Sequence, residues 1–168
     1  MGLYFFLLGA GVISRLIPHA WNFTPVTSVA IFAAIYLSKR EAVVLPLAIR
    51  FVSDAIIGFF SLPLMMAVYG SHLFGVVMGR WVRKKKTLFR LIVGPLLSAT
   101  IFFLVTNFAW FYESYPHTFH GILQSYMNGL PFFRGTLLGD VFYTLVLVGG
   151  YECILAFQSK RRLQISIS

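Results

Sequence analysis

Six apolar runs fill most of the chain, and their length determines what it can fold into. A helix of about 20 apolar residues crosses a hydrocarbon core about 30 Å thick. A soluble domain carries about 25% charged residues, whereas this chain of 168 residues has 11% charged and 58% hydrophobic residues, which excludes a soluble globular fold. The sequence predicts an all-α membrane protein, a six-transmembrane-helix bundle forming one domain over residues 1–168. Its predicted helices cover residues 3–17, 26–37, 42–60, 64–82, 88–112 and 136–157.

The basic residues indicate how this bundle is oriented. Eleven of the fourteen Lys and Arg residues lie in three clusters: Lys39, Arg40, Arg80, Arg83, Lys84, Lys85, Lys86, Arg90, Lys160, Arg161 and Arg162. Because cytoplasmic loops are enriched in Lys and Arg, six crossings with both termini inside (N-in, C-in) place every cluster in the cytoplasm. We therefore expect a multi-pass protein of the bacterial inner (plasma) membrane. The formal charge of +9 then indicates contact with the lipid bilayer and not with nucleic acid.

Three charged residues inside predicted crossings are candidates for a special role, because a charge there costs free energy unless it is paired or functional. Arg50 and Asp54 are four residues apart, which places them on one helical face within pairing distance. Two interpretations stay open for them: a structural ion pair that locks helix packing, or a charged group that faces a bound solute. Asp140 lies near the outer end of the last run, where it is either solvated or part of a site.

The predicted outer loops 18–25 and 113–135 mix hydrogen-bonding residues with aromatic ones. A ligand pocket combines apolar walls with a few convergent polar groups in this way. The alternative is an aromatic belt at the membrane surface, which would not need the His, Asn and Glu residues found here. Residues 117–130 have a weakly amphipathic helical pattern that suits a segment across the mouth of the bundle.

Metal binding and catalysis are not expected. His19, His117 and His120 lie in the outer loops, but no HExxH motif or carboxylate cluster accompanies them. A lone His72 within the fourth run is typical of a hydrogen-bonded packing residue. Ser71, Ser98 and Cys153 have no recognisable base partner. The sequence therefore predicts no cofactor, no metal site and no enzymatic activity.

Small residues line the first two runs, and two interpretations are open for them. Gly9, Ala10, Gly11 and Ser14 lie in the first run, and Ala30, Ala33 and Ala34 lie in the second. Such residues let helix backbones approach closely. They serve either packing within the bundle, which we favour, or docking of a partner membrane protein.

Several stretches carry a family resemblance: 22–34, 46–58, 106–110, 115–116 and 131–140. They resemble an uncharacterised family of small bacterial membrane proteins, which is in turn similar to the substrate-binding S components of energy-coupling factor (ECF) vitamin transporters. This resemblance implies a pocket that faces outward for a vitamin, and a coupling subunit with ATPases as partner. S components dock through an Ala-xxx-Ala motif in the first helix. This chain departs from that motif, with Ala10-xxx-Ser14 there and Ala30-xxx-Ala34 one helix later.

These observations favour a membrane-embedded binding and transport protein for a small solute of the vitamin class. The alternative is a membrane scaffold or assembly protein of the cell envelope, of the shape-determining type, which is similar in size and helix number. The predicted substrate-binding residues are Asn22, Thr24, Asn107, Trp110, His117, Tyr126 and Asp140, with Arg50 and Asp54 as the structural ion pair.

Overall fold

The computed structural model describes the backbone of residues 1–18 and 20–167, and the side chains of residues 1–18 and 20–161. Over these residues it contains six α-helices, one short 3-10 helix and no strand, which confirms the predicted all-α class. The elements are α1 (Gly2–Leu16), α2 (Val26–Tyr36), α3 (Lys39–Ile57), α4 (Leu62–Lys84), α5 (Leu88–Thr106), η1 (Ala109–Phe111) and α6 (Phe119–Ile167). Of the residues named in the sequence analysis, His19 and the side chain of Arg162 lie outside the described part of the chain.

The last helix differs most from the sequence prediction. Residues 117–130 were expected to form a helical segment within the outer loop 113–135, separate from a last helix that begins at residue 136, but α6 is continuous from Phe119 onward and includes Pro131. Contacts with the end of α5 fix this segment, because Ser125 Oγ and Tyr126 Oη each donate a hydrogen bond of 2.7 Å to a carbonyl near that end. The predicted fifth helix was also too long, since α5 ends at Thr106. Pro131 and the polar residues near it suggested a break before the last helix. The contacts with α5 hold the segment in one continuous helix.

Local sequence signals set where α3 and α5 begin. At α3, the Ser38 hydroxyl accepts from the Glu41 backbone amide and the Glu41 carboxylate accepts from the Ser38 amide, which is a capping box. At α5, the Thr87 hydroxyl accepts from the Arg90 amide. Both caps satisfy amide groups that a helix start leaves without a partner.

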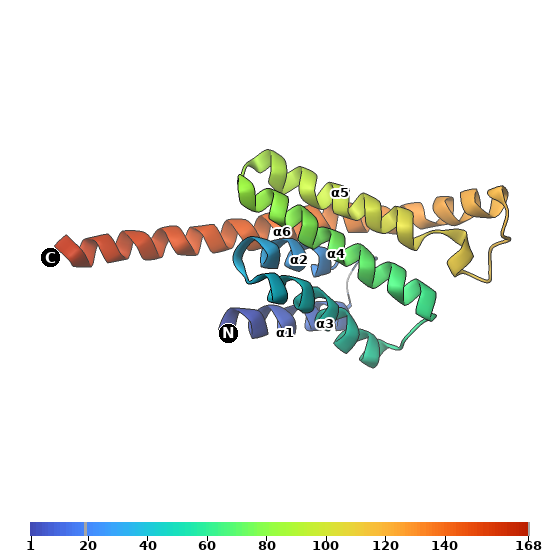
Figure 1. Ribbon diagram of the computed structural model, residues 1–168, viewed down its shortest axis with the longest axis horizontal. Coiled ribbons are helices and arrows are strands. Elements are labelled where there is room, and N and C mark those ends of the chain that lie inside the picture. Colours follow the sequence, from blue (N-terminus) through green and yellow to red (C-terminus); the bar gives the residue numbers. More distant parts are fainter. Residues whose placement is uncertain (19, 168) are drawn as a thin grey trace.

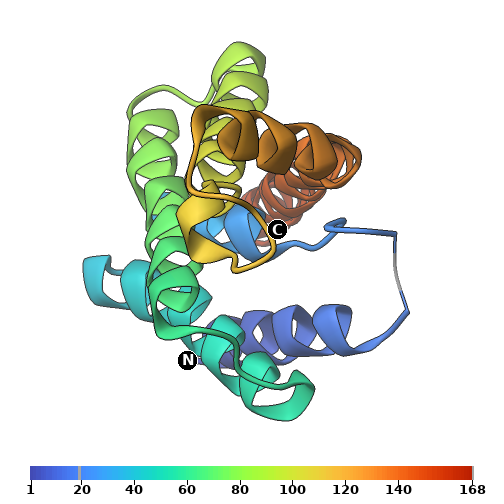
Figure 2. The same cartoon turned by 90° about the vertical axis from the view of Figure 1, so that its right-hand side faces the viewer.

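The short helix α2 is the centre of the bundle. Ten of its eleven residues are buried, and it contacts each of the other five α-helices. Seen from the end, the longer helices surround it (Figure 2). Glycine allows the closest of these contacts, because a Cβ atom added at Gly79 would meet the Ile31 carbonyl and the Ala34 side chain. The small residues of α2 therefore pack within the bundle, as we favoured.

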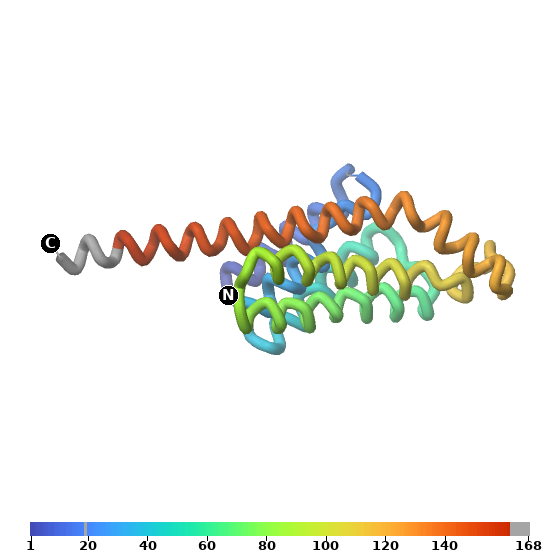
Figure 3. The backbone as a smooth tube through the Cα atoms, turned by 90° about the horizontal axis from the view of Figure 1, so that it is seen from above, coloured from blue at the N-terminus to red at the C-terminus, as the bar shows by residue number. Residues whose placement is uncertain are grey.

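The chain reverses direction at each connection between α-helices, so the N-terminus and the C-terminal end of α6 lie on the same side (Figure 1). The α2–α3 and α4–α5 connections, which border the basic clusters, lie at that end too. The α3–α4 connection and residues 107–118 lie at the opposite end. The C-terminal part of α6 projects well beyond the other helices (Figure 3).

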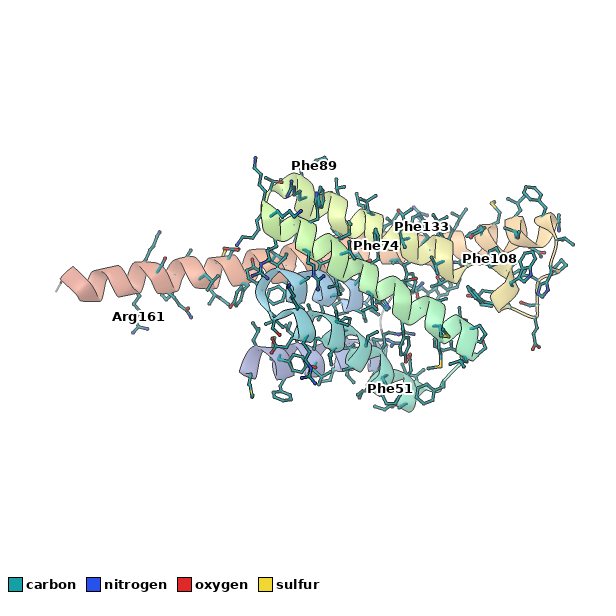
Figure 4. The ribbon with its side chains drawn as sticks, in the orientation of Figure 1. Phe51, Phe74, Phe89, Phe108, Phe133 and Arg161 are labelled. Carbon is teal, nitrogen blue, oxygen red and sulfur yellow. The ribbon has the colours of Figure 1, made fainter. Side chains whose placement is uncertain are left out.

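Among the described residues, three helices are long and apolar enough to cross a membrane by length and composition: α4, α5 and α6 up to Arg161. The helices α1 and α2 have 15 and 11 residues, so they are about 22 Å and about 16 Å long. Many large apolar side chains face outward, including Phe51 and Phe89, which are 58% and 67% exposed (Figure 4). An apolar exterior of this kind suits lipid and not water.

Candidate functional site

A cluster of buried charges joins α1 to α3. Arg15 Nη2 lies 2.9 Å from Asp54 Oδ1, and Arg50 Nη2 lies 3.1 Å from Asp54 Oδ2. The pairing of Arg50 with Asp54 is the one that their spacing predicts, whereas Arg15 was not anticipated as a partner. Two guanidinium groups thus share one carboxylate, and the three groups together carry a net positive charge.

Neighbouring hydroxyl groups complete this cluster. Tyr69 Oη of α4 donates a hydrogen bond of 2.8 Å to Asp54 Oδ2. Arg15 Nη1 donates one of 2.7 Å to Ser53 Oγ, which itself donates to the Ile49 carbonyl. The exposed fraction of the Asp54 side chain is only 2%. Buried charges need full hydrogen bonding to be tolerated, and Asp54 has it.

An inner chamber of about 370 Å³ lies beside the cluster, and all six α-helices contribute to its wall. We define the inner chamber by its lining residues: Arg15, Trp21, Asn22, Thr24, Thr27, Arg50, Ile57, His72, Phe102, Phe132, Thr136 and Asp140. Its volume lies in the range of small-molecule sites, about 300–1,000 Å³. Aromatic rings and hydroxyl, amide and charged groups alternate around it.

Three polar atoms of this wall are buried, and in the part of the chain that the structure describes none has a hydrogen-bond partner. These open polar atoms are Arg50 Nε, His72 Nε2 and Asp140 Oδ2. They come from α3, α4 and α6. Buried polar atoms in folded proteins are almost always hydrogen-bonded to protein or to ordered water, so three open ones on residues of one chamber wall set this wall apart. Thr144 Oγ1 is a fourth such atom, one turn further along α6 and not part of the chamber wall.

Thr27 of α2 connects the two open residues His72 and Asp140. Its hydroxyl lies 3.1 Å from His72 Nδ1 and also interacts with the Asp140 carboxyl group. Asp140 is 2% exposed, and none of the three ion pairs among the described side chains includes it. Asp140 is therefore a buried acid of the chamber wall and not a solvated residue of the outer boundary.

Close packing of α6 against the α1–α2 connection holds this wall together. A Cβ atom added at Gly135 would collide with the Trp21 carbonyl group, so only glycine lets this backbone approach. Asn22 follows with a positive φ of 57°, a conformation that Asn adopts more readily than most residues. The geometry places Trp21 and Asn22 over the same turns of α6 that carry Thr136 and Asp140.

A second cavity, the outer hollow, adjoins the inner chamber on the side of the 107–118 connection. Its volume is about 440 Å³, and it shares Asn22, Arg50, Phe102 and Phe132 with the inner chamber. Its remaining wall comes from Phe60, Leu64, Val68, Thr106, Asn107, Tyr112, Ser114, Tyr115, Ser125, Asn128 and Gly129. The outer hollow thus adjoins the chamber at the end of the bundle opposite the termini.

The predicted site residues separate into several groups. Asn22, Thr24 and Asp140 line the inner chamber, and Asn107 lines the outer hollow. Trp110 and His117 stack with their ring centroids 5.0 Å apart and line a separate surface hollow beside Ser61 and Glu113. Tyr126 uses its hydroxyl to tie α6 to the Leu104 carbonyl of α5. The structure therefore brings three of the seven residues into one chamber.

Besides its aromatic and apolar residues, the chamber wall has four hydroxyl or charged and titratable residues that sequence reasoning missed: Arg15, Thr27, His72 and Thr136. A signal existed for Arg15, because it is a charge within a predicted crossing. His72 resembled a packing residue, and its contact with Thr27 fits that interpretation, but its second nitrogen is one of the open polar atoms. Hydroxyl residues such as Thr27 and Thr136 gave no signal.

Other buried hydroxyl groups are satisfied within their own helices, as Thr136 of the chamber wall is by donating to the Phe132 carbonyl. Ser71, Ser98 and Thr106 each donate to the carbonyl group four residues earlier in their own helix. Hydroxyl groups commonly satisfy their hydrogen bonds in this way inside helices.

Among the described residues there is no group of three or more His, Cys, Asp and Glu side chains that could hold a metal ion.

Comparison with known proteins identifies a family. A family model described as a family of unknown function (DUF6580) matches residues 1–163, and the chain belongs to that family. No curated protein and no solved structure matches the chain.

Proposed function

We propose that this DUF6580 member is a membrane-embedded binding and transport protein for a small solute of the vitamin class. The solute enters through the outer hollow and binds in the inner chamber. The observation that carries this proposal is the convergence of three open polar atoms, from three helices, on one cavity of ligand size. A cell-envelope scaffold does not require a polar cavity of ligand size inside the bundle, so we favour binding over that alternative.

We further propose six crossings of the bacterial inner membrane with both termini in the cytoplasm. The alternating helix directions and the basic clusters at one end support this orientation (Figure 1). Although α1 and α2 are shorter than the hydrocarbon core, α2 lies inside the bundle. The other helices can therefore shield its ends and the extended segment before it from lipid, as backbone at membrane depth requires.

The similarity to S components makes a coupling subunit with ATPases the partner class that we propose for delivery. Ala30 and Ala34 are buried in the bundle core, 0% and 3% exposed, so they are not available for docking. Ala10 lies exposed on α1. We therefore assign the docking surface to α1.

Ligand capture from an extract tests the binding proposal. Purified protein in lipid nanodiscs is incubated with the small-molecule fraction of a rich growth medium, and retained compounds are identified by mass spectrometry. The comparison variant is Thr136→Phe, which places a ring in the inner chamber. The matched control is Leu138→Phe, because Leu138 lies two residues away on α6 and is 67% exposed. We expect a compound retained by the natural protein and by Leu138→Phe, but not by Thr136→Phe. Equal retention by all three proteins, or none by any, would contradict the proposal.

A further inference from the structure

The inner chamber has two chemically different sides, and the first is cationic. Arg15 and Arg50 share the single carboxylate of Asp54, so this side carries one positive charge that its acid does not balance. Arg50 Nε is one of the open polar atoms. The cluster therefore contains an uncompensated charge and, on Arg50 of the chamber wall, a buried N–H donor that has no partner among the described residues.

The second side is acidic. Asp140 lines the same chamber from α6, and its Oδ2 is an open polar atom. Thr27 interacts with Asp140 and with His72 Nδ1, which leaves the open His72 Nε2 as a neighbouring polar group. An ion pair with Arg15 or Arg50 would neutralise Asp140, but both guanidinium groups bind Asp54 instead.

A ligand can supply an opposite charge to each of these sides, an anionic group to the two arginines and a cationic group to Asp140. An uncompensated charge buried in a medium of low dielectric costs several kcal/mol, and a paired and hydrogen-bonded charge costs much less. A simple anion would neutralise the arginine side only, and a simple cation would neutralise Asp140 only. A molecule that carries both charges neutralises the two sides together.

We infer that the solute is a small zwitterion, with a carboxylate bound by the Arg50 side of the inner chamber and a protonated amine bound by Asp140. This inference rests on the proposed function and names its ligand class. The rings of Trp21, Phe102 and Phe132 form the aromatic part of the chamber wall. A chamber of about 370 Å³ suits a compound from amino-acid size to that of a small vitamin.

Chemical blocking of the extract tests this inference. One portion of the small-molecule fraction is left untreated, in a second the amines are acetylated, and in a third the carboxylic acids are converted to methylamides. Each portion is incubated with the nanodisc protein and with Thr136→Phe, and specifically retained compounds are measured. We expect specific retention from the untreated portion and its loss from both treated portions. Retention that survives either treatment would overturn the zwitterion inference and leave the binding proposal standing. No retention from any portion would contradict the binding proposal itself.

A substitution at the acidic side gives a second test. Asp140→Asn keeps the shape of the side chain and removes its charge, so the dissociation constant of the retained compound should rise at least about ten-fold. Thr144→Val, one turn along α6 and outside the chamber wall, should leave that constant unchanged. An unchanged constant in Asp140→Asn would overturn the inference. If Asp140→Asn does not fold, the blocking experiment on the natural protein still decides.

Discussion

Arg15 near the end of α1 forms an ion pair of 2.9 Å with Asp54 of α3, thirty-nine residues later in the chain. Their side chains are 11% and 2% exposed. The pair fixes α1 against α3 and places Arg15 at the wall of the inner chamber. It therefore serves both the fold and the proposed site.

Removing the shared carboxylate should strongly destabilise the protein. Asp54→Asn leaves Arg15 and Arg50 buried without an acid, and breaking a buried ion pair in this way costs about 3–5 kcal/mol. We expect a large fall in the free energy of unfolding, measured by denaturant titration in detergent micelles. Tyr69→Phe removes only one hydrogen bond to Asp54 and should cost about 1 kcal/mol. Equal effects of the two substitutions would contradict this description of the cluster.

The ion pair at the basic end of the bundle should contribute much less. Lys86 and Glu152 are 40% and 41% exposed, and an exposed ion pair contributes about 0–1 kcal/mol because water and salt screen it. Lys86→Met should therefore change the unfolding midpoint only slightly, and less still in high salt. A loss of stability in Lys86→Met as large as that in Asp54→Asn would contradict this weak contribution.

Gly135 should not tolerate a side chain. In Gly135→Ala the new methyl group collides with the Trp21 carbonyl, and overpacking of this kind costs about 1–3 kcal/mol. The control is Gly149→Ala on the same helix, where no atom lies within 4 Å of the new methyl group. Because alanine is the better helix former, the control should gain up to about 1 kcal/mol. Thermal unfolding of both variants checks the difference, and destabilisation of Gly149→Ala alone would refute it.

The capping box at the start of α3 should make stability depend on pH. The Ser38 hydrogen bonds to Glu41 lower the pKa of that carboxyl group below its ordinary value. A lowered folded-state pKa stabilises the fold at pH values above the unfolded pKa, and this contribution disappears as the pH falls through the folded pKa. The natural protein should therefore exceed Glu41→Gln in thermal stability at neutral pH, and the difference should shrink in acid. A difference that is constant with pH would contradict this role of Glu41.

The features that could be predicted from the sequence are those that depend on residues close together along the chain. The apolar runs gave all six helices, because the length and composition of each run decide whether it becomes a buried or lipid-facing helix. The pairing of Arg50 with Asp54 follows from their separation by one helical turn. The pairing of Arg15 with Asp54 could not be predicted, since it depends on how α1 packs against α3.

The predictions that were wrong likewise concern features that depend on how helices pack against one another. The helical pattern of residues 117–130 was recognised, but Pro131 and the neighbouring polar residues concealed that this segment continues into the last helix and packs against α5. The grouping of Asp140 with Thr27 and His72 depends on α6 and α4 both packing against α2. Trp110 and His117 are aromatic and polar, as a pocket requires, yet they lie in a separate surface hollow.

The orientation of the bundle in the membrane is the central claim, because the proposed chamber can take up a solute only if it opens outward. The native Cys153 is exposed, so the measurement uses a Cys153→Ser background with a single cysteine in place of Lys85 or His117. Both positions are exposed and lie at opposite ends of the bundle. Intact cells are treated with a maleimide that does not cross membranes. The account predicts labelling of His117→Cys in intact cells and of Lys85→Cys only after permeabilisation. Labelling of both positions from the same side would contradict it.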